Sequence, residues 1–130
     1  MTREVINPEG LPDSEQLGYS QAIIENGTLY ASGQTAWDTD FEVRDNDIES
    51  QTRKALENVG VLLDEISKDH GDIAKVTSYV VKPHDRLEGL LSVWDDFFNS
   101  PYPAHTLVGV DQLAMEGFLV EFDIEVPLEE

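Results

Sequence analysis

Cysteine is absent from this sequence, and basic residues are few. The lack of cysteine excludes disulfides, thiolate nucleophiles and cysteine-ligated metal sites. The 8 lysines and arginines are scattered, and only Arg53 and Lys54 are adjacent. Binding to a phosphate backbone or to an anionic membrane surface needs clustered basic side chains. We therefore expect neither nucleic acid nor a membrane as a partner.

Long apolar runs are also missing. No segment approaches the roughly 20 apolar residues that a membrane-spanning helix needs. The residues that follow Met1 lack the basic-then-apolar pattern of a secretory signal. These absences predict a cytoplasmic protein.

Acidic residues, in contrast, are abundant. Asp and Glu total 27 against 8 Lys and Arg, giving a formal net charge of −19, and they are spread from Glu4 to Glu130. With 40% hydrophobic residues the chain can bury a core, so we interpret it as folded rather than disordered. Self-repulsion weakens such a domain in dilute buffer, whereas near 1 M salt the screening length falls to about 3 Å. We interpret the composition as adaptation to a salt-rich cytoplasm, that of a halophile.

The length of 130 residues is enough for a single domain, 1–130, around one core. Residues 1–7 predict a short edge strand. Asn26-Gly27 stands between two apolar runs, which is a strong hairpin signal because both residues tolerate positive φ. We therefore expect paired strands over about 18–25 and 28–33.

Two amphipathic helices and a strand are expected next. Apolar residues recur every three or four positions over 47–68, with Asp45 or Asp47 as the N-cap and Gly71 as the stop. Residues 72–81 predict a strand, which we place centrally because both of its faces are apolar. The second helix should begin at a capping-box-like Asp85 and continue to Phe98.

The last two predicted strands, 103–110 and 119–126, alternate between two unlike faces. If the strands are neighbours, His105 and Leu107 share one side of the sheet with Glu121. The even-numbered residues would then pack under the two helices and leave the odd-numbered side open. We expect another copy of the chain to cover that side. The fold class is α+β: one mixed sheet with two helices on one face.

Several local sequences, in this order and spacing, resemble the Rid family, also called the YjgF, YER057c and UK114 family. The resemblance covers nearly the whole chain and implies a chorismate-mutase-like fold, a homotrimer and small-molecule clefts between neighbouring subunits. The matching segments are Gly18-Tyr19-Ser20-Gln21-Ala22, Ser32-Gly33-Gln34, Gly71-Asp72-Ile73, Phe97-Phe98, Tyr102-Pro103-Ala104 and the last strand with Glu121.

The resemblance also implies an activity, which is hydrolysis of reactive enamines and imines, such as 2-aminoacrylate, to keto acids and ammonia. It implies no metal and no organic cofactor. Glu121 matches the carboxylate that orients water, and Leu107 matches a backbone position that faces the substrate. Tyr19 and Gly33 match the aromatic residue and the glycine of the hairpin. His105 replaces the arginine that holds the substrate carboxylate, and Leu91 replaces a cleft asparagine.

The replacement of arginine by His105 leaves the function open. Arginine pairs with a carboxylate through a permanently charged fork, which histidine cannot reproduce. A protonated His105 could hold an anion weakly, whereas neutral His105 could act as a general base or bind an uncharged substrate. Three hypotheses follow: a Rid-like deaminase with altered substrate preference, a non-catalytic metabolite-binding trimer, or a structural His105–Glu121 pair across the trimer interface. The net charge disfavours a ribonuclease.

Overall fold

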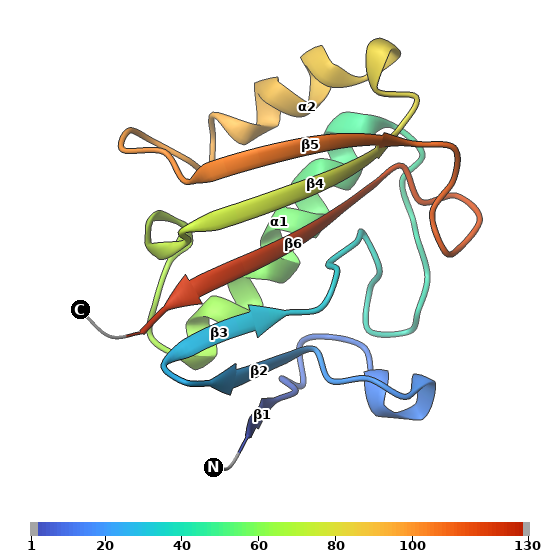
Figure 1. Cartoon of the computed structure of the whole chain (residues 1–130). Helices are drawn as coiled ribbons and strands as arrows, with labels where there is room; N and C mark the ends of the chain where they lie inside the picture. The colour runs from blue at the N-terminus through green and yellow to red at the C-terminus, as the bar shows by residue number, and fades with distance from the viewer. Residues whose placement is uncertain (1–2, 129–130) are drawn as a thin grey trace.

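A computed structural model describes residues 3–128. These residues form a six-stranded mixed sheet and two α-helices, and the strand order is β1-β2-β3-β6-β4-β5 (Figure 1). The elements are β1 (Glu4–Ile6), β2 (Ala22–Glu25), β3 (Thr28–Ala31), α1 (Ile48–Glu65), β4 (Lys75–Val81), α2 (Leu87–Trp94), β5 (Ala104–Val110) and β6 (Val120–Pro127).

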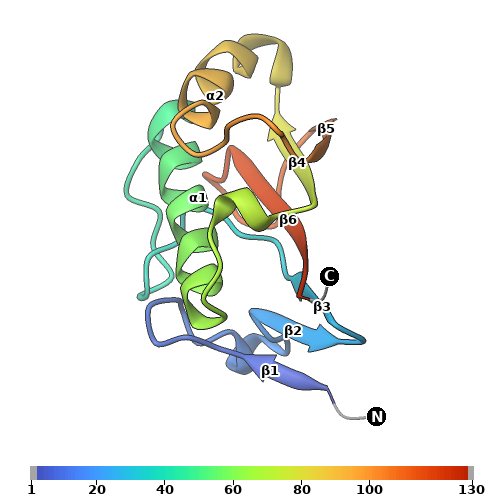
Figure 2. The same cartoon turned by 90° about the vertical axis from the view of Figure 1, so that its left-hand side faces the viewer.

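Both α-helices lie on the same face of the sheet, as the sequence predicted (Figure 2). The apolar stripe of α1 packs onto the even-numbered residues of β4 and β6, and these side chains form the centre of the core. Phe122 is fully buried there, so its truncation to alanine should cost roughly 3–5 kcal/mol. Among residues 3–128, no helix is long and apolar enough to span a bilayer.

The predicted hairpin is confirmed. Asn26 and Gly27 have φ of 54° and 75°, and β2 pairs antiparallel with β3 on either side of them. Both strands are shorter than predicted. Residues 18–21 form a loop, and the chain bends at residues 32 and 33 before Gln34 rejoins the sheet opposite Phe122.

The helix α1 begins where predicted but ends earlier. Asp47 is the N-cap, and its carboxylate accepts a hydrogen bond from the Ser50 N–H. Gly71 does not end the helix. Ser67 adopts a φ of 59°, and the Lys68 N–H donates to the Leu63 carbonyl at 3.0 Å, which is a Schellman-type stop.

The boundaries of β4 and α2 were also predicted too wide. Residues 70–72 form a short 3-10 turn capped by Asp69, so β4 begins only at Lys75. β4 is nevertheless an inner strand, as expected. The predicted capping box at Asp85 is wrong because Asp85 ends another 3-10 turn, and α2 starts at Leu87 without a side-chain cap.

The last two strands are not neighbours, contrary to the prediction. β4 lies between them, parallel to β5 and antiparallel to β6. His105 is opposite Val76, whose side chain is buried under the helices, whereas Glu121 is opposite Tyr79, one position out of phase. Because directly opposed residues point to the same side of a sheet, His105 and Glu121 lie on opposite faces.

The assignment of faces was therefore wrong for β5 and right for β6. In β5 the odd-numbered residues His105 and Leu107 face the helices, and the even-numbered residues Thr106 and Val108 are exposed. In β6 the even-numbered residues are buried. Alternation in β5 did not reveal the buried side, because β5 is an edge strand with short apolar side chains on both faces.

Candidate functional site

Glu121 lies on the face of the sheet that the helices leave open, and its side chain crosses the backbone of Gly33. A Cβ atom added to Gly33 would overlap the carboxyl group of Glu121. Glycine at this position therefore permits the close approach of the Glu121 side chain, and no unusual φ is involved. Burial raises the pKa of the half-buried Glu121 carboxyl, and the negative charge of Asp123 raises it further. A carboxyl group with a raised pKa can exchange protons near neutral pH more readily than an ordinary one.

Tyr19 belongs to the same cluster. Its pKa is raised, first by burial and then by the charge of Glu121, which places the phenol within electrostatic reach of the carboxylate. The loop that carries Tyr19 is fixed by Ser14, whose buried hydroxyl donates to the Tyr19 carbonyl at 2.7 Å. The structure thus brings Tyr19, Gly33 and Glu121 together, although they come from three separate segments.

Buried amides join the Tyr19 loop to the Gly33 bend. The Gln34 side chain donates to the Gln21 side-chain oxygen at 2.9 Å, and Gln21 in turn donates to the Pro12 carbonyl. Ser32 completes the link, since its hydroxyl donates to the Ser20 carbonyl at 2.6 Å. Because every polar atom in these contacts has a partner, the network should hold the two segments in fixed positions.

Asp123 and Tyr79 extend this polar face beside Glu121. The Tyr79 hydroxyl donates to Oδ2 of Asp123 at 3.1 Å. Burial raises the pKa of Asp123 although this hydrogen bond opposes the rise, and the charge of Asp123 is the largest cause of a raised pKa at Tyr79. Two half-buried carboxyl groups therefore stand side by side on β6.

His105 lies on the covered face, in a different environment. Its imidazole stacks on Trp94 of α2, with ring centroids 4.3 Å apart and planes 17° from parallel. Its Nε2 is 2.7 Å from the hydroxyl of Ser78, a residue with no exposed surface. Burial, followed by the charge of Lys75, lowers the pKa of His105. His105 is consequently neutral at neutral pH and is held by Ser78 and Trp94.

The distance between His105 and Glu121 follows from the register. His105 is level with Ile124, three residues along β6 from Glu121, and β4 separates the two strands. That corresponds to about 10 Å along the strands and about 10 Å across them, in addition to opposite faces. The two side chains cannot act on one small molecule within a single chain.

Leu107 and Leu91 also lie apart from the Glu121 cluster. Leu107 is half-buried on the helix side of β5 and packs against the core. Leu91 is on the outer side of α2 with 43% of its surface exposed. Of the six predicted site residues, the structure therefore groups Tyr19, Gly33 and Glu121 and leaves the other three elsewhere.

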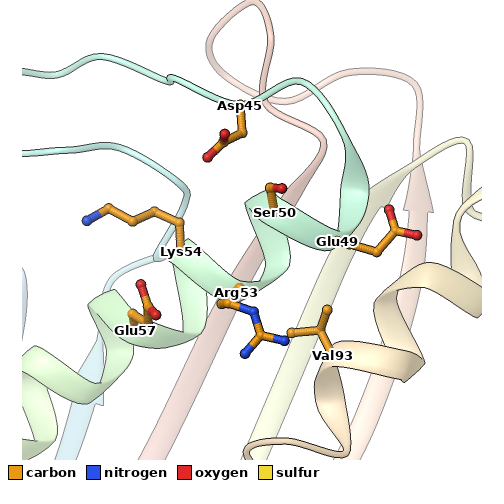
Figure 3. Close-up of a pocket in the computed structure, with 7 residues that line it drawn as sticks. All are labelled: Asp45, Glu49, Ser50, Arg53, Lys54, Glu57 and Val93. Carbon is orange, nitrogen blue, oxygen red and sulfur yellow. The ribbon is translucent and has the colours of Figure 1, made fainter.

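A hollow of about 310 Å³ lies on the helix layer and not on the sheet (Figure 3). Its lining carries charges of both signs, and Arg53, one of the lining residues, is paired with Asp96 at 2.6 Å. No predicted site residue lines it. Its lining residues are Asp45, Glu49, Ser50, Arg53, Lys54, Glu57 and Val93.

A metal site is not found either. Within residues 3–128, no three histidine, aspartate or glutamate side chains are grouped so that they could hold a metal ion.

Comparison with known proteins gives the family. The model of the family described as Endoribonuclease L-PSP matches residues 13–127. This chain belongs to that family, which includes the Rid and YjgF proteins. A Rid family protein of Yersinia pestis, whose function is described as unknown, has a solved structure with a TM-score of 0.88 and 32% identity. The match covers 97% of this chain and 99% of that one.

Two further proteins are similar to this chain, and one of them is named for an activity. The RutC family protein YjgH of Escherichia coli is 35% identical over 109 residues, covering 83% of this chain and 79% of YjgH. A protein of Dermatophagoides farinae named 2-iminobutanoate/2-iminopropanoate deaminase is 30% identical over 100 residues, covering 73% of this chain and 74% of that protein.

Sequence reasoning missed the residues that support the Rid-type cluster. Gln21, Gln34 and Ser32 were noted only as parts of matching segments, and Asp123 was not singled out. A signal was present, because two glutamines within strand-like segments are unusual unless their amides are paired in the interior. Tyr79 carried no such signal, since an aromatic residue in a strand is ordinary.

Proposed function

We propose that this protein hydrolyses reactive imines or enamines to carbonyl compounds and ammonia, with Glu121 orienting the attacking water. The main support for this proposal is the position of Glu121. Its half-buried side chain lies across the Gly33 backbone, within electrostatic reach of the Tyr19 phenol. The raised pKa of Glu121 suits proton exchange with water. The relative named as an imine deaminase supports the same chemistry.

Tyr19 and the backbone at Gly33 would shape the pocket in this proposal, and Leu107 would contribute its backbone. His105 would bind or protonate the substrate, and Leu91 would line the cleft. Because His105 and Glu121 lie on opposite faces of one sheet, a site that uses both must combine two copies of the chain.

A homotrimer with clefts between subunits would meet this requirement. Exposed apolar side chains on the open face support an assembly that covers it: Val5, Tyr30 and Val108 expose 47%, 44% and 37% of their surfaces. They come from β1, β3 and β5 and so span the sheet. Light scattering in molar KCl should give a mass of three chains, and a stable monomer would contradict the interface-cleft proposal.

The catalytic proposal is tested by removing one carboxylate and keeping its neighbour. Ammonia release from freshly generated 2-aminoacrylate and from uncharged imines is measured for the wild type, Glu121→Gln and Glu125→Gln. We expect Glu121→Gln to lose at least about 100-fold in rate. Glu125 lies on the same face of β6 but is exposed, so Glu125→Gln should retain activity. Full activity in Glu121→Gln would contradict the assignment.

The second candidate is a trimer that binds a metabolite without turning it over. The observation that favours it is the packing of His105 against Trp94 and Ser78, which leaves no charged clamp in the place of the family arginine. The variant His105→Arg separates the two candidates. A gain of imine hydrolysis would identify a lost carboxylate clamp, whereas inactivity of both proteins toward every imine would favour the binding protein.

A ribonuclease, the activity in the description of the family, is not our proposal. The open face carries Glu121, Asp123 and Glu125 on one strand. A polyanion would be repelled from such a face unless basic side chains neutralised its phosphates.

A further inference from the structure

Within residues 3–128 of one chain, no basic side chain contributes to the pKa shift of Glu121. Lys75 is the one lysine or arginine in the six strands of residues 3–128. Its Nζ lies 2.6 Å from the Thr106 hydroxyl, and the register places Lys75 opposite Glu125. Four residues of strand, about 13 Å, separate that position from Glu121. Lys75 therefore does not neutralise Glu121.

The charge that Glu121 does experience is negative. Asp123 stands two residues away on the same face and is half-buried, with the Tyr79 hydroxyl bound to its Oδ2. The carboxylate of a ligand that contacted Glu121 would thus be a third negative group in a partly desolvated place. Like charges brought together at a binding surface are strongly unfavourable.

His105 does not offset this negative charge. Whichever copy of the chain supplies it, its imidazole is stacked on Trp94, its Nε2 is occupied by Ser78, and its pKa is lowered by burial. A neutral imidazole held in this way offers no cation to the open face.

We infer that the Glu121 site accepts imines and enamines that carry no carboxylate, as uncharged molecules or as protonated iminium ions. This inference rests on the proposed function and names its substrate class. Glu121 and Asp123 attract an iminium ion and repel a 2-imino acid.

The hydrolysis balances with water as the one co-reactant. Water oxygen bonds to the C=N carbon of the iminium ion while Glu121 takes a proton from the water. Glu121 returns that proton to the nitrogen, the C–N bond breaks to release ammonia, and the hydroxyl proton passes to that ammonia as the carbonyl forms. The products are the carbonyl compound and ammonium.

The test uses two imines that differ by one carboxylate. Propan-1-imine is generated from propylamine by an amine oxidase, and 2-iminobutanoate is generated from 2-aminobutanoate by an amino-acid oxidase. We expect the wild type to accelerate hydrolysis of propan-1-imine, relative to its spontaneous rate, at least about tenfold more than that of 2-iminobutanoate. An equal or greater acceleration of 2-iminobutanoate overturns the inference and leaves the proposed function standing.

A binding measurement separates this inference from the proposed function. The stable pair 2-oxobutanamide and 2-oxobutanoate is titrated by NMR, and the amide should bind several-fold more tightly. If neither imine is hydrolysed but the amide is preferred, the charge preference holds and the catalytic proposal fails. Equal or tighter binding of 2-oxobutanoate overturns the inference.

The variant Asp123→Asn tests the stated cause. It removes the neighbouring negative charge with little change of shape. The ratio of the affinities for 2-oxobutanamide and 2-oxobutanoate should therefore fall several-fold. Glu125→Gln removes the same charge from an exposed position opposite Lys75, where solvent screens it, and should lower this ratio less. Equal discrimination in Asp123→Asn and wild type overturns the electrostatic explanation.

Discussion

The two faces of the central sheet carry opposite kinds of polar group. On the open face Glu121 and Asp123 are half-buried carboxyls whose pKa values are raised, chiefly by burial. On the covered face His105 is a neutral imidazole, satisfied by Ser78 and stacked on Trp94. Burial of the two carboxyl groups on the open face disfavours their charged forms and so does not help folding. The contacts of His105, in contrast, complete the packing of the edge strand β5.

This contrast suggests different roles for the two faces, with function on the open face and stability of the fold on the covered face. Groups held in an unfavourable ionisation state mark functional sites more often than groups that are satisfied by their neighbours. Glu121 fits the first description and His105 the second. This contrast supports the proposal that catalysis takes place on the open face, and it makes His105 a packing residue of its own chain.

Among changes to the polar groups of the two faces, the largest expected effect is on stability, from His105→Ala. The change leaves the buried Ser78 hydroxyl without a partner and removes the stack on Trp94, which together should cost roughly 2–4 kcal/mol. The control is Thr106→Ser on the opposite, exposed face, which keeps the hydroxyl that Lys75 contacts, and there we expect a change within about 0.5 kcal/mol. Urea unfolding measures both, and equal losses would contradict a packing role for His105.

The second largest effect is expected on activity, from Gly33→Ala. The new Cβ would occupy the place of the Glu121 carboxylate, so the side chain must move. We expect imine hydrolysis to fall by roughly 10- to 100-fold, which corresponds to about 1.4–2.7 kcal/mol at the barrier, without a comparable loss in unfolding free energy. Gly71→Ala, in the 3-10 turn before β4, is the control. Unchanged activity in Gly33→Ala would show that the position of Glu121 is not critical.

The two faces should respond to pH in opposite directions. The folded-state pKa of Glu121 is raised, so its stabilising contribution is present below its ordinary pKa of about 4.3 and is lost as pH rises through the folded value. Glu121→Gln should therefore be no less stable than wild type at pH 7. An isosteric Glu121→Gln protein that unfolds more easily at pH 7 would contradict this sign.

His105 has the opposite sign. Its pKa is lowered in the fold, so its contribution is present above about pH 6.5 and is lost as pH falls toward the folded value. Fluorescence of the stacked Trp94 should report the protonation as a change below pH 6.5. The same titration of His105→Gln is the control, and an identical curve for the two proteins would exclude His105 as the source.

The smallest effect concerns salt. The unfolding midpoint of the wild type should rise between dilute buffer and about 1 M KCl, because screening removes repulsion among the excess carboxylates. Asp123→Asn removes one of these charges and should reduce the slope slightly. Ser78→Ala, which changes no charge, should leave the slope as it is. A wild-type midpoint that does not rise with salt would end the salt-adaptation hypothesis.

The helices and strands could be predicted from the sequence more accurately than the order of the strands in the sheet. The Asn26-Gly27 hairpin and the Asp47 cap were correct because their signals are local. The prediction that His105 and Glu121 share one face of neighbouring strands was wrong because strand order is a property of the whole sheet: β4 separates two strands that are consecutive in the chain. The three residues that the structure groups, Tyr19, Gly33 and Glu121, were selected by family resemblance, whereas the Gln21–Gln34 link depends on contacts between distant segments.

The position of β6 has a consequence for the order in which the molecule is made. β6 is the last strand of the described residues, yet it lies between β3 and β4 in the sheet. Until it emerges from the ribosome, the β1–β3 segment and the β4–β5 pair have no strand to join them, and both present unpaired edges. Folding of the sheet must then wait for β6, and the Glu121 cluster forms in that same closing step.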